Sequence, residues 1–238
     1  MVQSVAYRDQ PTDLSQSPYR WHLQDRDTCS LYWQFNHLQG IKITEQAHLN
    51  IDEWLDPDSA QFNQMLHDAV FHYSPRATRG ERFEVCIATS EMREAAWKYA
   101  HQSQIILDGT FGICDKKILL FIIMGLDENK KGVPLAFLLF SAPSGNRHTA
   151  AGYNTEIIAK LIDEWKKSLG TQNRKEFEAW VAITDTDLME RGALLIVFPR
   201  IWLLICKFHI RQSWRNHQNK ELKGNSPLHI DVKIDFAG

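Results

Sequence analysis

The chain has 238 residues, of which 44% are hydrophobic and 24% charged, and its formal net charge is −2. This composition is typical of globular proteins and excludes a wholly disordered or fibrous chain. The charge is uneven, because residues 1–58 hold 4 Lys or Arg against 9 Asp or Glu, whereas residues 59–238 hold 23 against 20. A polyanion would therefore meet the part of the chain after residue 58.

Several common classes of site are excluded by missing motifs. The four cysteines form no Cys-x-x-Cys pair, which argues against a zinc ribbon and favours a reducing compartment. Motifs typical of phosphate loops, dinucleotide folds, serine hydrolases and zinc proteases are missing from the sequence. The longest apolar run, Ile118–Leu126, is far shorter than the ~20 residues of a membrane span. We expect a soluble, intracellular protein with no membrane partner.

The sequence before residue 103 predicts little regular structure in its first part and helices in its second part. Residues 1–58 are acidic with scattered aromatic residues, and we expect a partly ordered N-terminal region there. Residues 59–102 are expected to form a helical lead-in. Apolar residues recur at helical spacing over residues 59–73 and 91–101, and a loop rich in Arg, with Pro and Gly, separates the two predicted helices.

A core over residues 103–220 follows, with a tail at 221–238. Short polar turns join the first three predicted strands, which favours an antiparallel meander. The predicted elements are strands at 105–113, 118–126 and 133–140, a helix at 153–169, a strand at 180–184, a helix at 188–197, a strand at 202–206 and a helix at 208–220. The order β-β-β-α-β-α-β-α predicts a mixed five-stranded α/β sheet flanked by helices on both faces. This arrangement resembles the ribonuclease-H-like fold.

Two aspartates are candidate ligands at the ends of predicted strands. Asp108 lies in the segment LDGTF of the first predicted strand. A carboxylate within a strand costs free energy unless it is paired or binds a metal ion. The alternative is that Asp108 and Gly109 simply form a turn that ends the strand. Asp185 follows the strand at 180–184, at the edge where open α/β sheets place ligands. Asp187 and Glu190 have the spacing of a helix-capping pair, which leaves Asp185 free. Carboxylates on neighbouring strands would need a divalent cation between them, and oxygen ligands suit Mg²⁺ or Mn²⁺.

Two further groups follow the last predicted strand. Cys206 and His209 form a Cys-x-x-His pair, which supplies only two of the four ligands of a structural zinc site, so a buried thiol beside a histidine is the alternative. Lys207, Arg211 and Arg215 are spaced i, i+4, i+8 and share one helical face. That face could contact DNA phosphates or could simply be solvated.

The chain resembles Mutator-like element (MULE) transposases over about residues 85–220. The matching segments are LDGTF at 107–111, GLDENKKGVPLAFLLFS at 125–141, ITDTDLMERGALLIVFP at 183–199 and LLICKFHIRQSW at 203–214. The resemblance implies a ribonuclease-H-like core with an Asp-Asp-Glu triad, DNA as partner, Mg²⁺ or Mn²⁺ as cofactor, a nuclear location and a homo-oligomer. It implies that Asp108 and Asp185 are the first two catalytic acids and cation ligands. Cys206 and His209 would be the family's Cys-x-x-His element, which could hold zinc.

The third acid of the triad has no good match in the sequence. The family places its Glu well beyond the Cys-x-x-His element, and Glu221, the only Glu after His209, lies too close to it. We therefore expect the chain, by itself, to bind metal without cutting or joining DNA. A non-catalytic module that binds DNA or protein is the alternative, and a ribonuclease-H-like nuclease that uses Asp187 or Glu190 is a weaker one.

Overall fold

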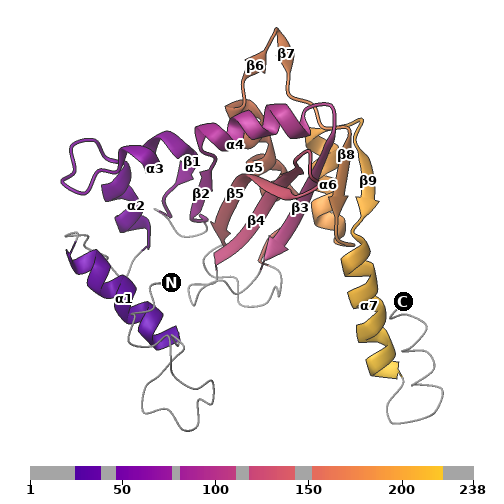
Figure 1. Ribbon diagram of the computed structural model, residues 1–238, viewed down its shortest axis with the longest axis horizontal. Coiled ribbons are helices and arrows are strands. Elements are labelled where there is room, and N and C mark those ends of the chain that lie inside the picture. The colour runs from indigo at the N-terminus through magenta and orange to yellow at the C-terminus, as the bar shows by residue number, and fades with distance from the viewer. Residues whose placement is uncertain (1–24, 39–46, 77–80, 111–117, 143–151, 222–238) are drawn as a thin grey trace, which may run out of the picture.

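The structure is a computed structural model that describes residues 25–38, 47–76, 81–110, 118–142 and 152–221 (Figure 1). The helices are α1 (Asp25–Leu38), α2 (Ala47–Leu55), α3 (Gln64–Ala69), α4 (Ser90–Ala95), the π-helical turn η2 (Ala96–Ala100), α5 (Thr155–Ser168), α6 (Leu188–Val197) and α7 (Lys207–Glu221). The strands are β1 (Val70–Ser74), β2 (Glu84–Ile87), β3 (Gln104–Thr110), β4 (Ile118–Leu126), β5 (Gly132–Ser141), β6 (Thr171–Gln172), β7 (Lys175–Glu176), β8 (Val181–Thr184) and β9 (Trp202–Ile205).

Seven of these strands form one mixed sheet in the order β1-β2-β5-β4-β3-β8-β9. Strands β3, β4 and β5 are the predicted antiparallel meander, and β8 and β9 are added to it in parallel. All five predicted strands are confirmed, with β4 at the centre. The predicted number of strands in the sheet, five, is too low, because β1 and β2 extend the sheet beyond β5. The remaining strands, β6 and β7, pair as a separate short hairpin.

The predicted helix over residues 59–73 forms only at Gln64–Ala69. Helix α3 ends at Ala69, and β1 begins at the next residue. The β1 sequence, VFHYS, is rich in β-branched and aromatic residues, which fit a half-buried pleated surface better than a helix. Pairing with β2 then decides the outcome, since β2 is held in turn by β5. Within the region before residue 59, which we expected to be partly ordered, the structure describes two helices, α1 and α2.

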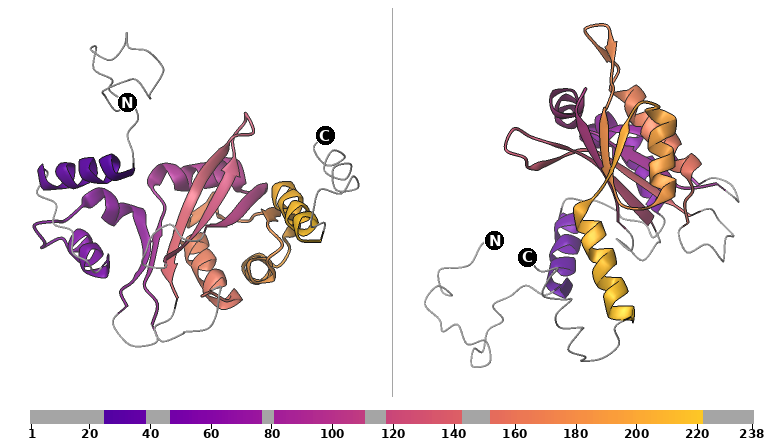
Figure 2. Two further views of the ribbon diagram at one scale, coloured as in Figure 1. Left: turned by 90° about the horizontal axis from the view of Figure 1, so that it is seen from below. Right: turned by 90° about the vertical axis from the view of Figure 1, so that its right-hand side faces the viewer.

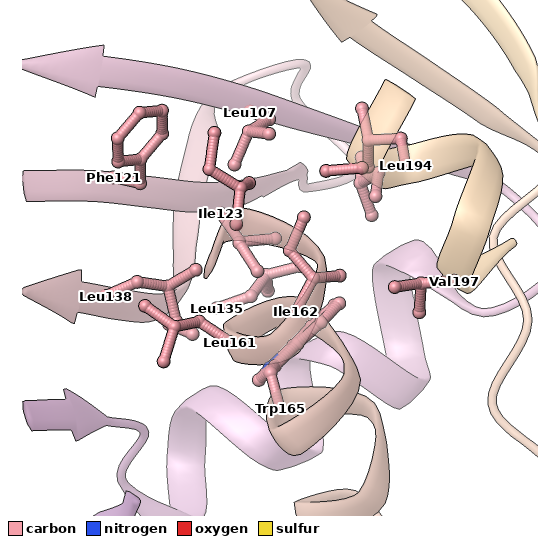
Figure 3. Packing of buried hydrophobic residues seen from close by; sticks show 14 of the residues in the cluster. Leu107, Phe121, Ile123, Leu135, Leu138, Leu161, Ile162, Trp165, Leu194 and Val197 are labelled. Carbon is pink, nitrogen blue, oxygen red and sulfur yellow. The ribbon is translucent and has the colours of Figure 1, made fainter. Parts of the chain in front are cut away.

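Helix α5 buries six of its residues in the core. It begins after Asn154, whose side chain accepts a hydrogen bond from the backbone N–H of Ile157 at 3.1 Å. Gly170 follows the end of the helix with a φ of +63°, a left-handed conformation that glycine adopts readily. The sequence predicted this helix-ending role for Gly170. Figure 3 shows the apolar side chains of α5 and α6 packed together beside those of the central strands; those labelled on the helices are Leu161, Ile162, Trp165, Leu194 and Val197.

Burial alternates along the central strand. Phe121 and Ile123 on β4 are fully buried, whereas Leu120, Ile122 and Met124, which point to the opposite face, are partly exposed. The described residues therefore pack one face of the sheet more completely than the other, and the prediction of helices on both faces is not confirmed by them. None of the described helices combines the length and apolar composition that a membrane span requires.

Candidate functional site

Asp108 and Asp185 come from neighbouring parallel strands. The pairing of β3 with β8 runs from Gln104 opposite Val181 to Ile106 opposite Ile183. If this register continues along both strands, Asp108 lies opposite Asp185. Residues in register on adjacent strands project from the same face of a sheet. The Asp108 side chain is 39% exposed. The two candidate acids therefore belong to neighbouring parallel strands, and each lies two positions beyond the last paired residues, Ile106 and Ile183.

The backbone around Asp185 is held by hydrogen bonds on both sides. Its Oδ1 accepts a bond from the N–H of Asp187 at 2.6 Å, and its carbonyl oxygen accepts one from Oγ1 of Thr184 at 2.8 Å. The N–H of Cys206 donates to the carbonyl of Thr184 at 2.6 Å, which ties the end of β9 to the same point. Asp185 is thus fixed where β8 leaves the sheet.

Asp187 has the capping role that the sequence predicted. Its Oδ1 accepts hydrogen bonds from the N–H groups of Met189 and Glu190, at 2.6 and 3.3 Å, at the start of α6. Its Oδ2 accepts a bond from the hydroxyl of Tyr153 at 2.7 Å. Both oxygens are used, so Asp187 anchors α6 beside Asp185.

Glu190 does not complete the expected capping pair. In a capping pair, the glutamate side chain would accept a hydrogen bond from the backbone N–H of Asp187. Here that N–H donates to the side chain of Asp185 instead. The Glu190 side chain is buried beneath α6, and a Cβ placed on Gly109 would lie only 3.1 Å from its Oε1. The other oxygen, Oε2, has no hydrogen-bond partner among the residues that the structure describes. A third carboxylate therefore lies next to the residue that follows Asp108.

The electrostatic surroundings of Glu190 are unfavourable to its ionised form. Burial, together with the smaller effects of the negative charges on Asp185, Asp187 and Asp108, raises the pKa of Glu190 to about 8. The opposite case is Glu84, for which burial alone would raise the pKa, but hydrogen bonds from His72 and Lys160 lower it. Glu190 is therefore a buried carboxyl group in a cluster of carboxylates.

The histidine of the Cys-x-x-His pair faces this cluster. In the first turn of α7, Nε2 of His209 lies 3.8 Å from Oδ1 of Asp108, which is too long for a hydrogen bond. Its buried Nδ1 has no hydrogen-bond partner in the described part of the chain. Over those same described ranges, no three His, Cys, Asp or Glu side chains are already arranged to hold a metal ion. The zinc role of Cys206 and His209 stays a prediction.

The predicted basic face lies on a helix that projects from the sheet. Figures 1 and 2 show α7 extending beyond the end of β9. Lys207, Arg211 and Arg215 are all exposed on α7. The aromatic ring of Trp214 on the same helix is half exposed. The helix therefore offers three cations and an aromatic surface close to the Asp108–Asp185 edge.

Comparison with known protein families gives a match that covers just under half of the chain. A family model described as the MULE transposase domain matches residues 104–213. No curated protein matches the chain. The matched residues begin with β3 and end within α7, so they include both aspartates, Glu190, the Cys-x-x-His pair and the first half of the basic helix. Residues 104–213 of the chain are therefore similar to the MULE transposase domain.

Proposed function

We propose that this domain supplies the divalent-cation site and part of the DNA-binding surface of a DNA transposase. The observation that carries the proposal is the parallel pairing of β3 with β8, whose register, continued beyond Ile106 and Ile183, would bring Asp108 level with Asp185. The ribonuclease-H-like fold is part of the proposal. It is supported by the strand order β5-β4-β3-β8-β9, in which three antiparallel strands are followed by two parallel ones.

The donor set at this edge fits Mg²⁺ or Mn²⁺. Asp108 and Asp185 offer carboxylate oxygens, which hard divalent cations prefer, and Oε2 of Glu190 has no positive partner among the described residues. A bound cation would supply Lewis-acid activation of a water or a 3′-hydroxyl and stabilise the leaving oxygen of a phosphodiester. Asp187, through Met189 and Tyr153, holds the start of α6 in place around Asp185.

The first prediction concerns DNA binding by α7. Changing Lys207, Arg211 and Arg215 together to Gln should weaken binding of the full chain to duplex DNA. It should also flatten the dependence of log affinity on log salt by about 0.9 for each phosphate that the helix no longer neutralises. Fluorescence anisotropy over a salt series measures both. Arg174 lies in the turn between β6 and β7, away from the aspartates, and Arg174→Gln serves as the control. An unchanged salt slope in the triple variant would show that the α7 face is only solvated.

The second prediction concerns turnover. The family reaction uses three acids, and the resemblance assigns only Asp108 and Asp185, while the buried Glu190 cannot touch DNA. We expect the full chain to leave supercoiled DNA intact in Mn²⁺ or Mg²⁺ and yet to bind it. Gel analysis beside an Asp108→Ala control is the measurement. Nicking that disappears in the control would contradict this prediction. DNA binding unaffected by Mn²⁺ or EDTA, in a chain that binds no Mn²⁺, would favour the non-catalytic module.

A further inference from the structure

Glu190 is one of two glutamates that are buried within the described ranges, and the two differ in their partners. Glu84 is 5% exposed, accepts a hydrogen bond from Nζ of Lys160 at 2.7 Å and lies 2.6 Å from Nε2 of His72. Glu190 is 2% exposed, and its Oε2 has no hydrogen-bond partner among the described residues. Folding removes water from both carboxyl groups, but only Glu84 is given cationic partners in exchange.

The position of Glu190 indicates where a partner would lie. Its Oε1 is turned towards Gly109, where the missing Cβ leaves room for it on β3 directly after Asp108. Its backbone N–H donates to Oδ1 of Asp187, whose own backbone N–H donates to Asp185. The Glu190 carboxyl group thus lies on the core side of the sheet, near the end of β3, on the face opposite to the one from which Asp108 projects. A buried carboxyl group without a partner is costly, and a metal ion is one of the few groups that offset this cost.

We infer that Glu190 is a third carboxylate ligand of the divalent-cation site, together with Asp108 and Asp185. This inference rests on the proposed function and adds a ligand from the buried face of α6. A bound cation would let the three carboxyl groups share one site, because its positive charge offsets the cost of placing carboxylates close together. Because Glu190 is shielded from solvent, it holds the ion in place and does not touch a DNA substrate.

Mn²⁺ binding to the full chain tests the inference. Electron paramagnetic resonance measures free Mn²⁺ during a titration of the wild type and of Asp108→Asn, Glu190→Gln and Glu156→Gln. Glu156 is a matched control, since it is a glutamate in the first turn of the neighbouring helix α5 but is exposed. Glu190→Gln should weaken binding by about tenfold or more, because loss of groups that merely orient a ligand already costs about 10–100-fold. Glu156→Gln should bind like the wild type.

A second measurement separates a ligand from a structural residue. The luminescence lifetime of bound Tb³⁺ in H₂O and D₂O reports the number of water molecules on the ion. Loss of the Glu190 oxygen should add water to the ion in Glu190→Gln. A residue that only supports the fold would change the affinity without changing the water count. Glu190→Asp keeps the charge but shortens the side chain, and it is expected to give intermediate affinity with added water.

The outcomes separate the inference from the proposed function. If the wild type binds no Mn²⁺, or if Asp108→Asn binds as well as the wild type, the proposed cation site is overturned. If Asp108→Asn weakens binding while Glu190→Gln matches the wild type in affinity and water count, only the role of Glu190 is overturned. Circular dichroism checks folding, and if Glu190→Gln fails to fold, a wild-type affinity and water count in Glu190→Asp overturns the inference.

Discussion

Replacing Glu190 with Gln should raise the free energy of unfolding at pH 7, in EDTA, by about 3 kcal/mol over that of the wild type. The pKa of Glu190 is about 8 in the folded chain, against an ordinary value of 4.5. Between these values the folded chain keeps a proton that the unfolded chain releases, so the wild type loses stability as pH rises from about 4.5 to 8. Gln has no such proton, and the variant escapes the loss.

Urea unfolding at pH 4.5, 6 and 7 measures this difference. The two stabilities should diverge by up to about 1.4 kcal/mol for each pH unit, with Glu156→Gln following the wild type. Parallel pH profiles for the wild type and Glu190→Gln would show that the buried carboxyl group is not held protonated. If Glu190 is a cation ligand, saturating Mg²⁺ should stabilise the wild type more than the variant and so narrow the gap.

Replacing Trp165 with Ala should reduce the free energy of unfolding by about 3–5 kcal/mol. Trp165 is fully buried on α5, and its ring meets the edge of Phe177 with centroids 5.2 Å apart. Its removal leaves a cavity between α5 and the segment that follows β7. Domains are commonly stable by only about 5–15 kcal/mol, so this is a large share.

Urea unfolding also measures the effect of Trp165→Ala. Glu156→Ala on the same helix is the control, and an exposed change of this kind should stay within about 0.5 kcal/mol of the wild type. A loss below about 1 kcal/mol in Trp165→Ala would contradict the packing described for α5.

Strongly periodic segments were predicted well, and short ones were not. The apolar run of β4 and the long stripe of α5 each fix one type of element over many residues, and both lie where the sequence placed them. β1 and β2 have five and four residues, too few for a clear period. They become strands because β5 offers a free edge to pair with, and no local pattern in the sequence reveals that edge.

The candidate site was predicted in part. The sequence singled out Asp108 and Asp185, but only the pairing of β3 with β8 shows that the two residues belong to neighbouring parallel strands. It also assigned Glu190 to capping, since the spacing from Asp187 fits. A signal for its burial was present, because Glu190 lies on the helical stripe of Ala193, Leu194 and Val197, all buried in α6. A carboxyl group on an apolar stripe indicates burial, and Gly109 provides the space for it.

The central claim is that Asp108 and Asp185 hold one divalent cation. Anomalous X-ray diffraction from crystals of the full chain grown with Mn²⁺ tests it most directly. We predict an anomalous peak at the ends of β3 and β8, with an oxygen of each aspartate directly coordinating the ion. An ordered Mn²⁺ bound elsewhere, or the two carboxyl groups turned to opposite faces of the sheet in the presence of Mn²⁺, would contradict it.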